Sequence, residues 1–315
     1  MKNYIKVVSF STMVIIIILM ASCDNSQQLT IMNQNNQLSL NSGCVDCGAD
    51  IGIHHNKILN YIEDNWQLLD TTSLTNNQAY EELNRIMSNY LRDSLVIHDS
   101  IIAFSYHNLL NSKYYDLLFP EEPIGYPFEF DIKSEILLII DSLLSLNNTQ
   151  LTYLTSQEAN FITNAMNFIF DSSYFNLNLE DAANLIISKV NFQISIFNNI
   201  NWGQNEGTIA CLFLSISKRS SQYWRDYSYI ETSDVPNGNL IEGIVFQDAG
   251  AALIGSGISI IKQGANNGKI ESTQVLTDAL EYAVAGSFPG GGKIVGNLLK
   301  GWFGKAVKIE KKKLS

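Results

Sequence analysis

Apolar side chains recur at helical spacing through the middle of this chain, most clearly over residues 131–146. The apolar positions of that stretch are Ile132, Ile136, Ile139, Ile140, Leu143 and Leu144. Side chains spaced three and four residues apart lie on one face of an α-helix, so this pattern predicts an amphipathic helix. Further helices are expected over residues 51–65, 78–92, 156–170 and 208–227, with another capped by Asn176 or Asn178. No pair of alternating strands stands out, and the predicted fold class is mostly α.

Glycine divides the chain into two regions. Fourteen of the 20 glycines lie in residues 238–315, after a turn-forming Asp-Val-Pro-Asn-Gly segment. The sequence therefore predicts an irregular multi-helix domain over residues 49–233, followed by a Gly-rich α-helical subdomain over residues 234–315. Residues 23–48 are rich in Asn, Gln and Ser and have no sustained period, which is typical of a tether.

The N-terminus has the layout of a secretory signal, because two lysines precede an apolar run over residues 7–21. Residues 19–23 (LMASC) resemble a bacterial lipobox, with Met20 where leucine is usual. The resemblance implies removal of residues 1–22 as a signal peptide. It also implies acylation of Cys23 with long fatty chains such as palmitate, and attachment to a membrane of the bacterial cell envelope. The choice between inner and outer membrane is left open.

Residues 52–62 (GIHHNKILNYI) resemble the GxxHNxxLxYI stretch of uncharacterised envelope lipoproteins from Bacteroidota-type bacteria. The resemblance covers little of the chain and implies no activity. Within this stretch, His55 is either a metal ligand or catalytic base, or a structural histidine whose hydrogen bonds are satisfied.

Cys44 and Cys47 form a CxxC pair that we expect to be a local disulfide. A metal site that combines this pair with His54 and His55, and a redox-active pair, are the alternatives. A second CxxC, which a structural zinc site usually needs, does not occur in the sequence. Cys211 lies in an apolar predicted helix and is expected to be a buried free thiol.

The C-terminal region contains spacings typical of close helix packing, such as the small pair Ala251 and Gly255. Residues 293–315 carry seven lysines and one glutamate and plot as a basic amphipathic helix. The candidate membrane-interacting residues are Lys293, Leu298, Leu299, Lys300, Trp302, Phe303 and Lys308. Residues 240–315 are therefore either a membrane-active, bacteriocin-like segment or a helical hairpin packed against the main domain.

A formal net charge of −11 argues against nucleic acid as a partner. The sequence lacks the HExxH, GxSxG and dinucleotide GxGxxG signatures, so no catalytic residue and no cofactor is predicted. The expected function is a non-enzymatic binding or envelope-interaction role. The expected partners are the membrane, through the lipid, and an envelope protein or ligand. A membrane-active effector and a metal-dependent enzyme are the two alternatives.

Overall fold

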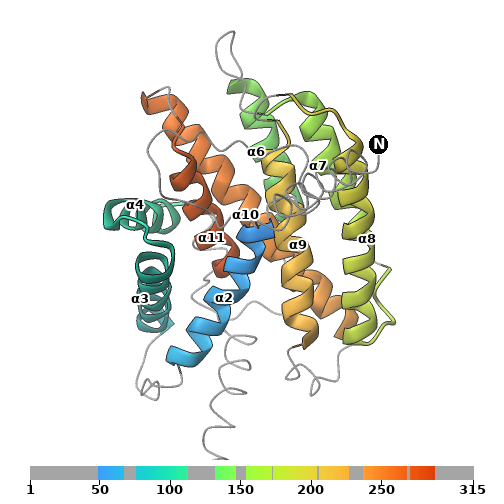
Figure 1. Cartoon of the computed structure of the whole chain (residues 1–315), viewed down its shortest axis with the longest axis horizontal. Coiled ribbons are helices and arrows are strands. Elements are labelled where there is room, and N and C mark those ends of the chain that lie inside the picture. Colours follow the sequence, from blue (N-terminus) through green and yellow to red (C-terminus); the bar gives the residue numbers. More distant parts are fainter. Residues whose placement is uncertain are drawn as a thin grey trace, which may run out of the picture. The chain divides into compact units, whose positions relative to one another are not determined.

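The computed structural model describes residues 49–66, 76–112, 132–146, 154–171, 173–203, 206–226, 237–267 and 270–287. These residues form nine helices and contain no strand, which confirms the mostly-α expectation (Figure 1). The helices are α2 (Ala49–Trp66), α3 (Asn76–Leu95), α4 (Asp99–Leu110), α6 (Ile132–Leu146), α7 (Ser156–Ile169), α8 (Leu179–Asn199), α9 (Thr208–Asp226), α10 (Asn237–Asn267) and α11 (Ser272–Gly286).

Local sequence signals explain where several helices begin. The side chain of Asn178 accepts a hydrogen bond from the backbone N–H of Asp181 at 2.8 Å, so Asn178 caps α8. Thr155 caps α7 in the same way, through the N–H of Glu158 at 3.2 Å. The first turn of α9 is capped from another helix, because Glu158 accepts from the N–H groups of Ile209 and Ala210 at 2.8 and 3.0 Å. This buried carboxylate therefore joins α7 to α9.

The hairpin formed by α10 and α11 lies at the centre of the described helices. Helix α10 packs against α6, α8 and α9, while α11 packs against α2 and α4. In Figure 1 α11 accordingly stands between α4 and α9, and α10 runs diagonally behind α9 toward α8. The most buried side chains of the molecule include Ile244, Val245 and Ala252 of α10. The Gly-rich region therefore supplies the middle of the hydrophobic core.

Small residues let the two helices of the hairpin approach closely. A Cβ atom at Gly255 would lie 2.6 Å from the carbonyl oxygen of Asp278, and one at Gly286 would lie 2.8 Å from that of Gln247. Real Cβ atoms do not approach backbone this closely, so both positions require glycine. Ala251, the other small residue of the predicted pair, also faces Gly286, because a Cβ atom added at Gly286 would lie 3.0 Å from Cβ of Ala251. The small-residue spacing thus serves packing between α10 and α11.

Candidate functional site

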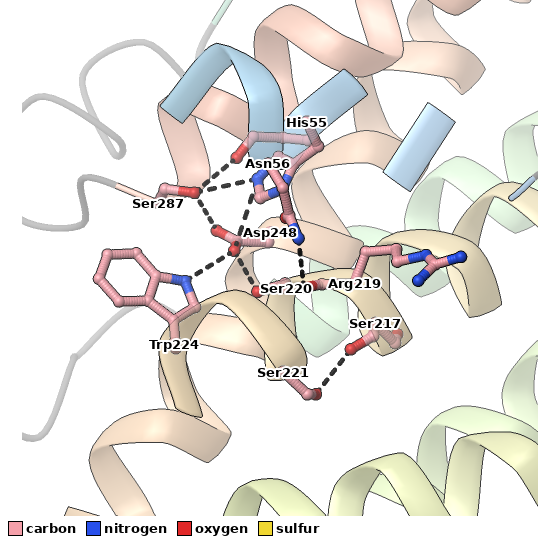
Figure 2. Close-up of polar contacts among 10 residues, drawn as sticks. His55, Asn56, Ser217, Arg219, Ser220, Ser221, Trp224, Asp248 and Ser287 are labelled. Carbon is pink, nitrogen blue, oxygen red and sulfur yellow. Dashed lines mark hydrogen bonds and ion pairs between the residues drawn. The ribbon is translucent and has the colours of Figure 1, made fainter. Parts of the chain in front are cut away.

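Polar side chains from four helices meet in the interior around Asp248 of α10 (Figure 2). His55 comes from α2, Ser220 and Trp224 come from α9, and Ser287 directly follows α11. His55, Ser220, Asp248 and Ser287 expose no surface at all, and Trp224 is almost completely buried. A fully buried carboxyl group needs hydrogen-bond donors in place of water, and these side chains provide them.

The carboxyl group of Asp248 has four polar neighbours. At Oδ2, the hydroxyl of Ser220 donates at 2.5 Å and the indole N–H of Trp224 donates at 3.3 Å. The hydroxyl of Ser287 lies 2.8 Å from Oδ1, and Nε2 of His55 lies 3.6 Å from Oδ2. Complete burial raises the pKa of Asp248, although His55 and the hydrogen bonds act in the opposite direction.

The hydrogen bonds of Asn56 determine which nitrogen of His55 carries a proton. The amide nitrogen of Asn56 donates to the carbonyl oxygen of Arg219 at 2.7 Å, so its Oδ1 faces Nδ1 of His55 at 3.0 Å. Only a protonated Nδ1 can bond that oxygen. In neutral His55, Nε2 is then unprotonated and accepts the hydroxyl proton of Ser287 at 3.1 Å. In this arrangement the bond of 2.8 Å between Ser287 and Oδ1 is donated by a protonated Asp248.

A second arrangement contains the same number of protons. It pairs a doubly protonated His55 with an ionised Asp248, and Ser287 donates to the carboxylate. The two arrangements differ by a proton shift through the Ser287 hydroxyl. Burial raises the pKa of Asp248, which favours the neutral arrangement, and the Asp248→Asn variant below tests which of the two is native.

The network has some of the parts of a nucleophilic site but not its usual arrangement. In a Ser-His-Asp triad the carboxylate bonds Nδ1 of the histidine, and the serine bonds Nε2. Here Nδ1 bonds Asn56, and both Ser287 and Asp248 lie on the Nε2 side. The hydroxyl of Ser287 is also engaged by Asp248, and neither residue is exposed. The geometry therefore supports proton sharing and helix joining rather than attack on a substrate.

A second buried polar cluster joins α4 to the hairpin. Asn108 of α4 bonds Asp278 of α11 at 3.4 Å and accepts from the ammonium of Lys262 of α10 at 2.8 Å. Gln274 donates to Ser105 of α4 at 2.6 Å and to Asp278 at 3.1 Å. Burial raises the pKa of Asp278 and lowers that of Lys262. The face of α4 that contacts the core is thus half polar, since Ser105 and Asn108 share it with Ile102 and Leu109.

Glu281 of α11 is a buried carboxyl residue whose oxygens form no hydrogen bond. It is completely buried, and neither of its carboxyl oxygens has a hydrogen-bond partner. Burial, together with repulsion from Asp278 three residues earlier, raises the pKa of Glu281 well above its ordinary value. Because the pKa of Glu281 differs between the folded and the unfolded chain, this residue is expected to make the folding stability depend on pH.

The structure separates the two histidines of the predicted metal site. His55 points into the Asp248 network, whereas Nδ1 of His54 lies 3.1 Å from the hydroxyl of Tyr90 on α3. Within the described ranges, no three His, Cys, Asp or Glu side chains gather as metal ligands. Cys44 and Cys47 lie outside those ranges, so the metal and local-disulfide hypotheses stay predictions.

Cys211 corrects one expectation. It is buried, as predicted, but it is disulfide-bonded, so the prediction of a free thiol is wrong. The acylation candidate Cys23 lies outside the described residues. So do all seven candidates of the basic tail, namely Lys293, Leu298, Leu299, Lys300, Trp302, Phe303 and Lys308.

Apart from His55, the residues that carry the two buried clusters were not predicted from the sequence. The available signal was a charged residue inside an apolar run, as with Asp248 before residues 249–254 and Glu281 within residues 279–286. Comparison of the chain with protein-family models, curated proteins and solved structures gives no match. The function therefore has to be argued from the chain itself.

Proposed function

We propose that this chain is a lipid-anchored protein of the bacterial cell envelope with a non-enzymatic, interaction-based role. The anchor is the acylated Cys23, and residues 24–48 connect it to the helical unit. The observation that carries the non-enzymatic part is the enclosure of His55, Asp248 and Ser287. These acid, base and hydroxyl groups bond one another across α2, α10 and the end of α11, which makes them a means of holding helices together.

The anchor is tested by mass spectrometry of the full chain after expression in a lipoprotein-processing bacterium. We expect the wild-type protein to lack residues 1–22 and to carry acyl chains on Cys23. We expect Cys23→Ala to keep residues 1–22, because the thiol is the acceptor of the first lipid and cleavage follows that step. Cys44→Ser is the matched control and should be processed like the wild type.

An unmodified Cys23 in the wild-type protein, or cleavage of Cys23→Ala at the same position, would contradict the proposed anchor. A folded chain with hydrolytic activity that disappears in Ser287→Ala would contradict the non-enzymatic role.

A second candidate function is insertion of the α10–α11 hairpin into a membrane. Residues Ile241–Ala265 of α10 are long and apolar enough to cross a bilayer, although most of that length is buried inside the helical unit. A charge at the bilayer centre costs at least about 2.5 kcal/mol, and a protonated Asp248 avoids that cost. This candidate requires α10 to leave the helices that enclose it, α6, α8 and α9.

A reversible lock between α6 and α10 tests the insertion hypothesis. A Cβ atom at Gly250 would lie 2.8 Å from Cδ1 of Ile132, so the pair Ile132→Cys and Gly250→Cys places two thiols close enough to be cross-linked. If the hairpin inserts, the wild-type chain releases dye from anionic vesicles and the oxidised double variant does not. The wild type with and without reductant is the control for the native disulfide. Absence of leakage by the wild type, or equal leakage by the locked variant, would remove this candidate.

A further inference from the structure

Half of the exposed large apolar side chains in the described residues lie between positions 168 and 196. Phe168 of α7 and Phe192 of α8 expose 40% and 53% of their surface, and their ring centroids are 5.4 Å apart. Ile196, one turn after Phe192, exposes 37%. Single apolar side chains on a surface need no explanation, but neighbours that share one patch on two helices indicate a contact site.

Helices α7 and α8 are antiparallel neighbours, so their outer residues form one face. The ring of Phe161 in α7 packs edge-on against Phe197 near the end of α8, whereas Phe168, later in α7, meets Phe192, earlier in α8. Figure 1 shows α8 at the edge of the described helices. Exposed residues one turn apart on these two helices make up what we call the α7–α8 face, namely Asn160, Asn164, Phe168, Phe192, Ser195 and Ile196.

The α7–α8 face carries no charge. Residues 159–169 and 190–199 include no Asp, Glu, Lys or Arg, and every exposed residue among them is Asn, Ser, Phe or Ile. An ion pair between Lys189 and Asp171, at 2.7 Å, lies at one end of the face. Leu138, the exposed large apolar residue of α6, differs from this patch because exposed Asp141 lies one turn away.

These properties favour a second copy of this chain as the partner. An interface between two identical surfaces must be self-complementary. Asn side chains supply both donors and acceptors, and aromatic rings stack on identical rings, so the α7–α8 face can pair with itself. Carboxylates cannot pair in this way, and two copies with a formal net charge of −11 repel each other elsewhere on their surfaces. We propose that two copies of the chain associate through the α7–α8 face, with Phe168, Phe192 and Ile196 at the centre of the interface.

An anionic bilayer is the main competing surface, and the α7–α8 face lacks the groups that bind one. Helices that lie on such bilayers carry Lys and Arg beside their apolar side chains. Helices α7 and α8 contain one basic residue, Lys189, and its charge is balanced by Asp171. Self-association does not depend on the proposed lipid anchor, so the test of Cys23 and the test of this face can fail independently.

Cysteine cross-linking of the full-length chain tests the association. Ser195 on α8 and Ser142 on α6 are matched sites, because both are exposed and each hydroxyl donates to a carbonyl oxygen of its own helix, at 2.6 and 2.7 Å. Lysates of cells that express the wild type, Ser195→Cys or Ser142→Cys are treated with a bismaleimide that has a flexible spacer. We expect a band of twice the chain mass to be enhanced in Ser195→Cys alone. The wild type controls for reaction of the native cysteines.

A charge placed on the face should separate the two copies. Phe192 and Leu138 are matched in exposure, at 53% and 52%. The purified full-length chain is compared by analytical ultracentrifugation in a detergent that matches the density of the solvent. We expect Phe192→Asp to weaken self-association at least about tenfold, as for a residue at the centre of an interface, whereas Leu138→Asp keeps the wild-type affinity. Circular dichroism should be unchanged in both variants, because neither site is buried.

Three results would overturn the inference. The first is a wild-type chain that sediments as a monomer at the highest concentration tested. The second is equal weakening of self-association by Phe192→Asp and Leu138→Asp, or cross-linking of Ser195→Cys to a protein of another mass. The third is protection of Ser195→Cys from a water-soluble thiol reagent only when lipid vesicles are present, because the face would then contact lipid.

Discussion

Replacing Asp248 with alanine is expected to lower the free energy of unfolding by about 3–5 kcal/mol. The substitution leaves the buried donors of Ser220 and Trp224 without an acceptor and also removes the group that bonds Ser287. Each unsatisfied buried polar group costs about 1–3 kcal/mol, and the space left by the side chain adds to the loss. Denaturant-induced unfolding followed by circular dichroism measures the difference.

Asp248→Asn distinguishes the two proton arrangements of the network. An asparagine oxygen in place of Oδ2 accepts from Ser220 and Trp224, and its amide nitrogen in place of Oδ1 donates to Ser287. It therefore mimics a protonated Asp248, and we expect it to cost less than about 1.5 kcal/mol. Asp141→Ala, at an exposed position of α6, is the control and should be close to neutral. A cost for Asp248→Asn as large as that for Asp248→Ala would show that the ionised arrangement is the native one.

The stability of the protein is expected to fall as pH rises above about 4.5, and Glu281 should account for much of that slope. Burial raises the pKa of Glu281, so the native state keeps a proton that the unfolded chain releases at the ordinary pKa of a glutamate. The stability is thus fully present below the unfolded pKa and is lost as pH rises toward the native pKa. One such carboxyl group contributes about 1.4 kcal/mol for each pH unit in that window.

Two substitutions of Glu281 separate titration from packing. Glu281→Gln cannot titrate, so we expect a flatter plot of unfolding free energy against pH in the range above about pH 4.5. Glu281→Met also removes both buried oxygens at similar volume, and we expect it to be more stable than the wild type at the upper end of that range. An unchanged slope in Glu281→Gln would contradict the assignment.

Helix periodicity predicts the parts of this fold in which one face is apolar and the other polar. Helix α6 follows its isoleucine and leucine pattern, and α8 begins at the predicted cap Asn178. The periodicity of apolar residues does not predict helix α4, because its buried face includes Ser105 and Asn108. These two side chains form hydrogen bonds with Gln274 and Asp278. A polar residue that is buried against another polar residue looks, in the sequence, like a surface residue.

The candidate site could not be predicted for a related reason. His55, Asp248 and Ser287 are separated by 193 and 39 positions, and their meeting depends on how α2 and the hairpin pack. The sequence did indicate His55 as a candidate site residue. One of its interpretations was a structural histidine whose hydrogen bonds are satisfied. Nothing in the sequence identified Asp248 as the neighbour of His55. A single acidic residue in an apolar segment can be buried against many different partners.

The order of the helices along the chain has a consequence for biogenesis. The helix that fills the middle of the molecule, α10, begins only at Asn237, so seven of the nine described helices are synthesised before it exists. Until it emerges, the apolar faces of α6, α8 and α9 that pack against it have no surface to cover them, and a partly made chain is prone to aggregate. A chaperone that binds the nascent chain would protect it during this period, and rapid synthesis of the segment that contains α10 would shorten the period.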